Sequence, residues 1–267
     1  MKYPFALSLS KGIFVVRQAH HERKLTHYPI LAPDAGMVPA SALPIFRALP
    51  TQVEVTKDPF SSFFQEVSQG SLVVRLPQLL EDGIRELPVK DVEYGLKVYQ
   101  KTDGAYAVAY AKGDVGSVGI PIPSDATKVG ITAHTHPPDE SLCPDRSRFC
   151  VYIPGVFSFR GITIHGIRNG DIGNFMTLDE KISLLKTTDK IWMLAKPEGW
   201  KRPEKAVIDQ VARNYLRLLK WSSEQEISAE RRRIERNALV NAARDLGLYL
   251  YISPQGQTDF VLQKTKP

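Results

Sequence analysis

The chain has 267 residues, of which 43% are hydrophobic and 24% are charged, a composition typical of a globular protein with a buried core. Its net charge of +6 at pH 7 permits an acidic partner, but the basic residues are scattered, so we expect no nucleic-acid interface. No apolar run reaches the roughly 18 residues that cross a bilayer, which excludes a membrane-spanning helix from the expected elements.

The N-terminal residues, 1–52, are predicted to form a poorly structured extension and linker. Their first part lacks sustained periodicity, and "APDAGMVPASALP" is rich in proline and alanine. The stretch from Pro4 to Arg23 also resembles the translation of a repeat element that recurs between bacterial genes. We therefore expect the native start to lie downstream, and we assign no function to His20 or His21.

Short helices followed by strands are predicted after this linker. "SSFFQEVSQGS" and "LPQLLEDGIRE" are typical of short helical or turn-rich segments. In "EYGLKVYQKTDGAYAVAYAKG", two alternating runs flank Thr102, Asp103 and Gly104, which is a strong hairpin signal. "KVGITAH" is rich in β-branched residues and is predicted to be a short buried strand. "CVYIPGVFSF" and "GITIHGI" are expected to form further strands or extended loops.

A helix and a strand are predicted next along the chain. Residues 171–188, "DIGNFMTLDEKISLLKTT", are predicted to be helical, with Asp171 at the N-cap. On this helix one face would carry Leu178, Ile182 and Leu185. "KIWMLAKPEG" is predicted to be a strand that ends in a Pro-Glu-Gly turn.

Two amphipathic helices and a hairpin are predicted to close the chain. "PEKAVIDQVARNYLRLLKWSS" begins with Pro203, which suits a first helical turn, and its apolar stripe is expected to consist of Val207, Val211, Tyr215 and Leu218. "SAERRRIERNALVNAARDLG" ends at Gly247, and "LYLYISPQGQTDFVLQK" follows as a hairpin. Because strands and helices are interleaved with hairpins, the predicted fold class is α+β or mixed α/β.

Two of the six histidines stand one residue apart at the end of the predicted buried strand. Alternate side chains of a strand share a face, so His134 and His136 are expected to point the same way. Pro137 and Pro138 end the strand at this point, which places both imidazoles at its C-terminal mouth. Two imidazoles on one face can bind zinc together; the alternative is a pair of surface histidines at a strand end.

These residues resemble the motif of a known family. "HTHP" after a short apolar strand, with a glutamate before it and an aspartate after it, resembles the JAB/MPN (JAMM) metalloprotease family. "EYGLKVYQKTDGAYAV" is similar to the part in which the family's catalytic glutamate precedes a glycine and a hairpin. "GDIGNF…KIWMLAKPEG" is similar to its metal-binding aspartate, the following helix and a strand. The resemblance covers about residues 91–199, and it is closest to bacterial JAB-like domains of toxin-type and other uncharacterised proteins.

The resemblance implies a fold and a division of the chain. The fold would be a cytidine-deaminase-like sheet flanked by helices. It would form a JAB/MPN-like metal-binding domain over residues 53–200. The two helices and hairpin of residues 201–267 would pack on this domain.

The resemblance also implies a zinc-dependent metallopeptidase. His134 and His136 would ligate Zn²⁺, an aspartate would supply the third ligand, and Glu93 would act as the general base. The substrate would be a protein or peptide, with a bond next to a ubiquitin-like tag as one candidate; neither a membrane nor a nucleic acid is implied. The alternative is a catalytically weak or inactive MPN-like module that binds a partner.

Two aspartates compete for the role of third ligand, which in the family ends a Ser-x-x-Asp tail. "SLCPD" offers Ser141 with Asp145 soon after the histidines, whereas "RNGD" offers Asp171 with Arg168 in the place of the serine. We favour Asp171 because it begins a predicted helix that the expected strand follows, so that residues 138–167 become a loop insertion. The missing serine would remove an oxyanion donor, for which Arg168 is the candidate substitute.

Three further residues are expected to play no part in catalysis. Cys143 and Cys150 lie in one proline-containing loop, where we expect two free thiols in a cytoplasmic protein. A local disulfide is the alternative for a secreted effector. His165 alternates with Ile162 and Ile164 and is interpreted as a structural residue.

Overall fold

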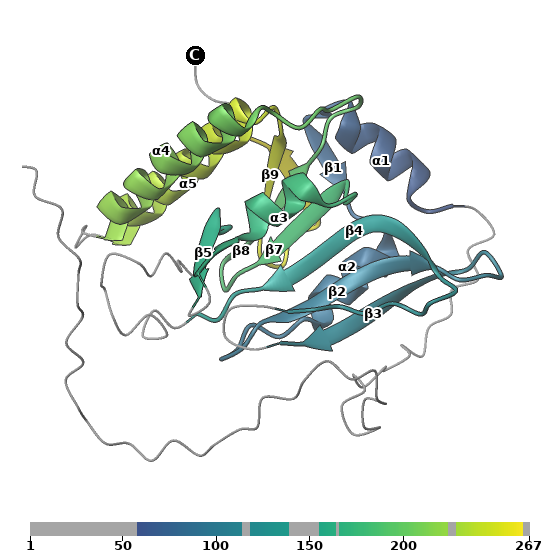
Figure 1. Cartoon of the computed structure of the whole chain (residues 1–267). Coiled ribbons are helices and arrows are strands. Elements are labelled where there is room, and N and C mark those ends of the chain that lie inside the picture. The colour runs from purple at the N-terminus through teal and green to yellow at the C-terminus, as the bar shows by residue number, and fades with distance from the viewer. Residues whose placement is uncertain (1–57, 114–117, 139–154, 164–165, 224–227, 264–267) are drawn as a thin grey trace, which may run out of the picture. The chain divides into compact units, whose positions relative to one another are not determined.

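The computed structural model describes residues 58–113, 118–138, 155–163, 166–223 and 228–263 (Figure 1). The chain divides after residue 42, and every described element belongs to the second unit, residues 43–267. The predicted N-terminal extension, 1–52, lies outside the described residues.

A mixed sheet of eight strands forms the centre of this unit. The strands are β1 (Val73–Arg75), β2 (Tyr94–Gln100), β3 (Tyr106–Lys112), β4 (Thr127–Thr135), β7 (Ile182–Lys186), β8 (Lys190–Ala195), β9 (Tyr249–Pro254) and β10 (Asp259–Leu262). They lie in the order β1-β10-β9-β8-β7-β4-β2-β3. Strands β4 and β7 run parallel, and the other neighbours are antiparallel. A separate two-stranded ribbon consists of β5 (Arg160–Thr163) and β6 (Gly166–Asn169).

Helices cover both faces of the large sheet (Figure 1). Successive side chains of β7 belong to different apolar clusters, because alternate residues of a strand point to opposite faces. Leu184 packs in a cluster with α1 and α2, and Leu185 packs in another with α3, α4 and α5. The helices are α1 (Ser61–Ser68), α2 (Gln78–Glu86), α3 (Asp171–Thr177), α4 (Lys205–Ser223) and α5 (Ser228–Asp245). The predicted mixed α/β class is confirmed.

Several predicted elements are present. Strands β2 and β3 form the expected antiparallel hairpin, and Gly104 in its turn has a φ of +86°, a conformation that favours glycine. Strand β4 contains "KVGITAH". Helix α5 ends just before Gly247, whose φ is +66°. None of the described helices is long and apolar enough to cross a membrane.

The prediction of one helix over residues 171–188 is wrong. Helix α3 ends at Thr177, the backbone of Leu178 is extended, and all five residues of β7 are buried. Ile182 and Leu185, which were expected on one helical face, belong to clusters on opposite faces of the sheet. A strand that is covered on both faces does not alternate between apolar and polar residues, so its short run cannot be told from a buried helical segment by periodicity.

The predicted apolar stripe of α4 is partly wrong. Val207 is 42% exposed, and Ile208 packs into the core in its place. Val211 and Tyr215 are buried as expected, while Leu218 is only partly buried. Since Ile208, Val211 and Tyr215 also follow helical spacing, the sequence allows two neighbouring stripes, and packing selects the second.

Candidate metal centre

His134 lies near the C-terminal end of β4, on the face of the sheet that α3 covers. Strand β4 ends at Thr135, and His136 follows it directly. The preceding residue, Ala133, packs in the cluster with α1 and α2. Because strand side chains alternate, His134 therefore points to the other face. There its ring lies against Phe157, with 6.0 Å between the ring centroids.

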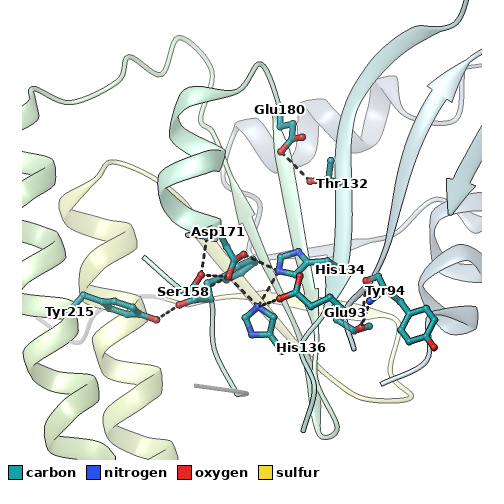
Figure 2. Close-up of polar contacts among 11 residues, drawn as sticks. Glu93, Tyr94, Thr132, His134, His136, Ser158, Asp171, Glu180 and Tyr215 are labelled. Atoms are coloured by element: carbon teal, nitrogen blue, oxygen red, sulfur yellow. Dashed lines mark hydrogen bonds and ion pairs between the residues drawn. The ribbon is translucent and has the colours of Figure 1, made fainter. Parts of the chain in front are cut away.

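Asp171 meets both histidines on this face (Figure 2). Its Oδ1 lies 3.3 Å from Nε2 of His134, and its Oδ2 lies 3.2 Å from Nε2 of His136. The two Nε2 atoms are 3.3 Å apart. One donor atom from each residue lies within 4.8 Å of the others. Three convergent donors of this kind could hold a metal ion.

Glu93 stands beside the three donors rather than among them. It directly precedes β2 and is buried, and its Oε1 lies 4.0 Å from Nε2 of His136. The backbone N–H of Tyr94 donates to Oγ1 of Thr135 over 3.0 Å. This contact fixes the start of β2 against the end of β4. The glutamate carboxylate is thus placed to contact a molecule that binds at the cluster.

Solvent reaches the cluster unequally. The side chains of His134 and Asp171 are 12% and 18% exposed, whereas those of His136 and Glu93 are 2% and 7% exposed. The open side therefore lies at His134 and Asp171.

Asp171 is the first residue of α3, and Gly170 is the N-cap. The prediction of Asp171 as N-cap is therefore wrong. Its Oδ2 accepts hydrogen bonds from the backbone N–H of Ser158, over 2.7 Å, and from the Ser158 hydroxyl, over 2.8 Å. Sequence reasoning missed Ser158, because it lies 13 residues before Asp171 and belongs to no spaced motif.

The charges of the cluster shift two pKa values. Burial alone would raise the pKa of the Asp171 carboxyl, but His134 and His136 hold it well below its usual range. Burial alone would lower the pKa of His134, but the charge and the hydrogen bond of Asp171 raise it, and Glu93 adds to the rise. The acidic groups thus favour positive charge at the centre of the cluster, whether a proton or a metal ion supplies it.

Other sequence-predicted residues fall outside the described part of the chain. These are Ser141, Cys143, Asp145, Cys150 and His165, and the side chain of Arg168 is also outside it. Three residues rather than two separate Ser141 from Asp145, so "SLCPD" does not match Ser-x-x-Asp. The structure brings Asp171 to the histidines, and the ligand roles themselves stay predictions.

Comparisons with known proteins assign this chain to no family. No family model matches the chain, and neither a curated protein nor a solved structure matches it. The likeness to JAB/MPN proteins therefore stays a resemblance of motifs.

Proposed function

We propose that this protein is a zinc-dependent metallopeptidase of JAB/MPN type, which hydrolyses a peptide or isopeptide bond. The observation that carries the proposal is the convergence of His134, His136 and Asp171 beside the buried Glu93. Three elements that are far apart in the sequence supply these side chains. They stand in the chain order that the motif resemblance implies.

The spacing of the donor atoms supports zinc. Two ligands that are each about 2.0–2.1 Å from a tetrahedral ion are about 3.3–3.4 Å apart. The Nε2 atoms of His134 and His136 are 3.3 Å apart, as two such ligands would be. The Asp171 carboxylate lies against both imidazoles, with Oδ1 3.3 Å from His134 Nε2 and Oδ2 3.2 Å from His136 Nε2. Two imidazoles with one carboxylate are also a donor set of catalytic zinc sites, in which a fourth position stays open to water.

The residues divide the work of hydrolysis between them. His134, His136 and Asp171 would hold the zinc ion, which would supply a polarised water molecule with a pKa lowered towards about 7. Glu93 Oε1 would accept the proton of this water and deliver it to the leaving amine. The position of Glu93, 4.0 Å from His136 Nε2, suits a base that contacts the water rather than a fourth ligand. Asp171 offsets part of the positive charge at the centre.

The substrate class rests on the motif resemblance. We propose a protein or peptide substrate, with a bond next to a ubiquitin-like tag as the first to test. We also propose a cytoplasmic location.

The metal content of the purified chain tests the proposal. Mass spectrometry should find one zinc per chain in the wild type, and the zinc should be lost in His134→Ala and Asp171→Ala. Asp145→Ala is the matched control, because it removes the competing aspartate, and it should retain the metal. A folded wild-type protein without stoichiometric zinc would contradict the proposal. Loss of zinc in Asp145→Ala alone would move the third ligand to that residue.

The alternative is a partner-binding module without activity, which the arginine in place of the expected serine favours. The position of Glu93 argues against this alternative. An inactive module has no need of a carboxylate beside the ligands, and Glu93 faces His136. Stoichiometric zinc without hydrolysis of any member of a library of fluorogenic peptides and lysine isopeptides would favour the alternative.

A further inference from the structure

Ser158 and Asp171 form a reciprocal set of hydrogen bonds. The Ser158 hydroxyl donates to Asp171 Oδ2 over 2.8 Å and accepts from the backbone N–H of Asp171 over 3.0 Å. The Ser158 N–H donates to the same Oδ2 over 2.7 Å. The N–H of Ile172 donates to the carbonyl of Ser158 over 2.9 Å. One hydroxyl can make both of its bonds, because it carries one proton and two lone pairs.

These bonds fix the rotation of the Asp171 carboxylate. Two donors hold Oδ2 from one side, and the N-terminus of α3 is tied to the same serine. The side chain therefore enters the cluster in one orientation before any metal binds. Partners of this kind orient metal-ligating groups and strengthen metal binding.

The segment that carries Ser158, residues 155–159, is itself held from three directions. Nε1 of Trp192 on β8 donates to the carbonyl of Gly155 over 2.8 Å. The hydroxyl of Tyr215 on α4 donates to the carbonyl of Phe157 over 2.7 Å. The N–H of Gly170, before α3, donates to the carbonyl of Phe159 over 3.1 Å. Figure 2 shows Tyr215 reaching from its helix towards the segment and the cluster.

The hydrogen bond from the Tyr215 hydroxyl to the Phe157 carbonyl is buried away from solvent. Tyr215 and Phe157 are 1% and 0% exposed, and both belong to the cluster that α3, α4 and α5 share. A buried carbonyl that loses its donor costs the free energy of its desolvation, so the segment has a strong preference for this position. The ring of Phe157 also lies against His134. This segment thus links helix α4 to two of the three donor residues. Phe157, which binds Tyr215, contacts His134, and the neighbouring Ser158 donates to Asp171.

We propose that Ser158 is a positioning residue for the metal ligand Asp171, and that Tyr215 holds Ser158 in place through the 155–159 segment. This proposal rests on the proposed function, because it takes Asp171 to be a ligand. It assigns a role to the C-terminal helices: α4 sets the affinity of the site for its metal. Removal of a partner that orients a ligand typically weakens metal binding about 10–100-fold.

The zinc dissociation constant of the full chain tests the role of Ser158. Competition with a chromophoric chelator should give about 10–100-fold weaker binding for Ser158→Ala. Ser158→Thr keeps the hydroxyl and should bind within about threefold of the wild type. The control is Ser253→Ala on β9, where a buried serine donates to the carbonyls of Pro254 and Gln257; it should bind zinc as the wild type does.

Tyr215→Phe tests the second half of the proposal without touching Ser158. It removes one hydroxyl and should weaken zinc binding at least about threefold. The matched control is Tyr251→Phe, which removes a buried hydroxyl that donates to the carbonyl of Val67 over 3.4 Å. Circular dichroism should show that each variant is folded. If Ser158→Ala does not fold, the zinc dissociation constant of Tyr215→Phe tests the proposal in its place.

The outcomes separate this proposal from the proposed function. Wild-type affinity in a folded Ser158→Ala variant, or in Tyr215→Phe, would overturn the positioning role while the zinc site stands. An equal loss of affinity in the Ser158→Thr variant would also overturn it, because the hydroxyl would then be irrelevant. A folded wild type that binds no zinc would instead overturn the proposed function.

Discussion

Glu93 and the three donor residues lie at different distances from the centre of the cluster, and their substitutions should therefore separate binding from chemistry. Glu93→Gln keeps the shape of the side chain but cannot accept a proton. We expect the zinc content to be retained and the rate of peptide or isopeptide hydrolysis to fall about 10²–10⁴-fold. The matched control is Glu86→Gln on the exposed surface of α2. Wild-type turnover in Glu93→Gln would remove this residue from the mechanism.

The pH dependence of stability should reverse between the metal-free and the zinc-bound protein. Burial alone would lower the pKa of His134 and raise that of Asp171, but the opposite charges outweigh it and shift both the other way. The ion pair therefore stabilises the metal-free fold fully above the usual aspartate pKa of about 3.9, and this contribution is lost as the pH falls through the lowered pKa of Asp171. On the alkaline side, the stabilisation is complete up to the usual histidine pKa of about 6.5, and it is lost as the pH rises through the raised pKa of His134.

Zinc binds only neutral imidazoles, so the rise in melting temperature on adding zinc should grow between about pH 6 and pH 8. Thermal unfolding in EDTA and in zinc, over this range, measures both effects. Asp171→Ala should flatten the metal-free pH profile, because it removes the acidic partner. A zinc-induced rise that is independent of pH would contradict the expectation.

The sequence was informative about some residues of the candidate site and silent about others. His134 lies in β4 and His136 directly follows the strand, so a period of two that continues for one residue beyond its end predicts their common face. Asp171 could be selected only through the motif resemblance. Ser158 could not be found, because its contact with Asp171 arises when a loop residue packs against the start of α3, and no spacing rule describes such a contact.

At the scale of elements, the loop before β4 packs against β2 beside the cluster. Gly95 on β2 pairs with His134 on β4. A Cβ atom at Gly95 would lie 2.7 Å from Cδ1 of Ile120 and 3.0 Å from Cγ1 of Val118. The absence of a side chain therefore allows residues 118–120 to lie close to β2.

Gly95→Ala should force residues 118–120 to shift and should lower the free energy of unfolding by about 1–3 kcal/mol, the usual cost of overpacking. Urea denaturation measures the change. Gly119→Ala is the control within the same loop, since a Cβ atom there meets nothing within 4 Å, and it should be nearly neutral. Equal stabilities of the two variants would show that the loop moves freely away from β2.

The elements also show where sequence patterns stop being decisive. The hairpin of β2 and β3 could be predicted because Asp103 and Gly104 mark its turn between alternating runs. The boundary between α3 and β7 could not, because "ISLLK" has only three apolar residues in five and fits a buried helix as well as a buried strand. Its pairing with β4 and β8 is a tertiary property, and it decides the outcome.

At the scale of the whole molecule, the C-terminal segment is part of the sheet. Strands β9 and β10 lie between β8 and β1, although some 50 residues of chain separate β8 from β9. Helices α4 and α5 share an apolar cluster with α3 and with Trp192 of β8. Residues 201–267 therefore supply interior strands and cover one face, and the elements that carry His134, His136 and Asp171 do not close a core without them.

This arrangement predicts that the chain cannot be divided after Trp200. A chain of residues 43–200 would leave the edge of β8 without its hydrogen-bonding partner, would leave β1 with no neighbour in the sheet, and would expose the apolar face that α4 and α5 cover. We expect it to show no cooperative transition in calorimetry. The control is a chain of residues 43–267, which keeps the whole second unit and should unfold in one transition. A cooperative transition in the 43–200 chain would instead show that the strands from β2 to β8 form a core of their own, and Tyr215 would then be dispensable for the fold that holds Asp171.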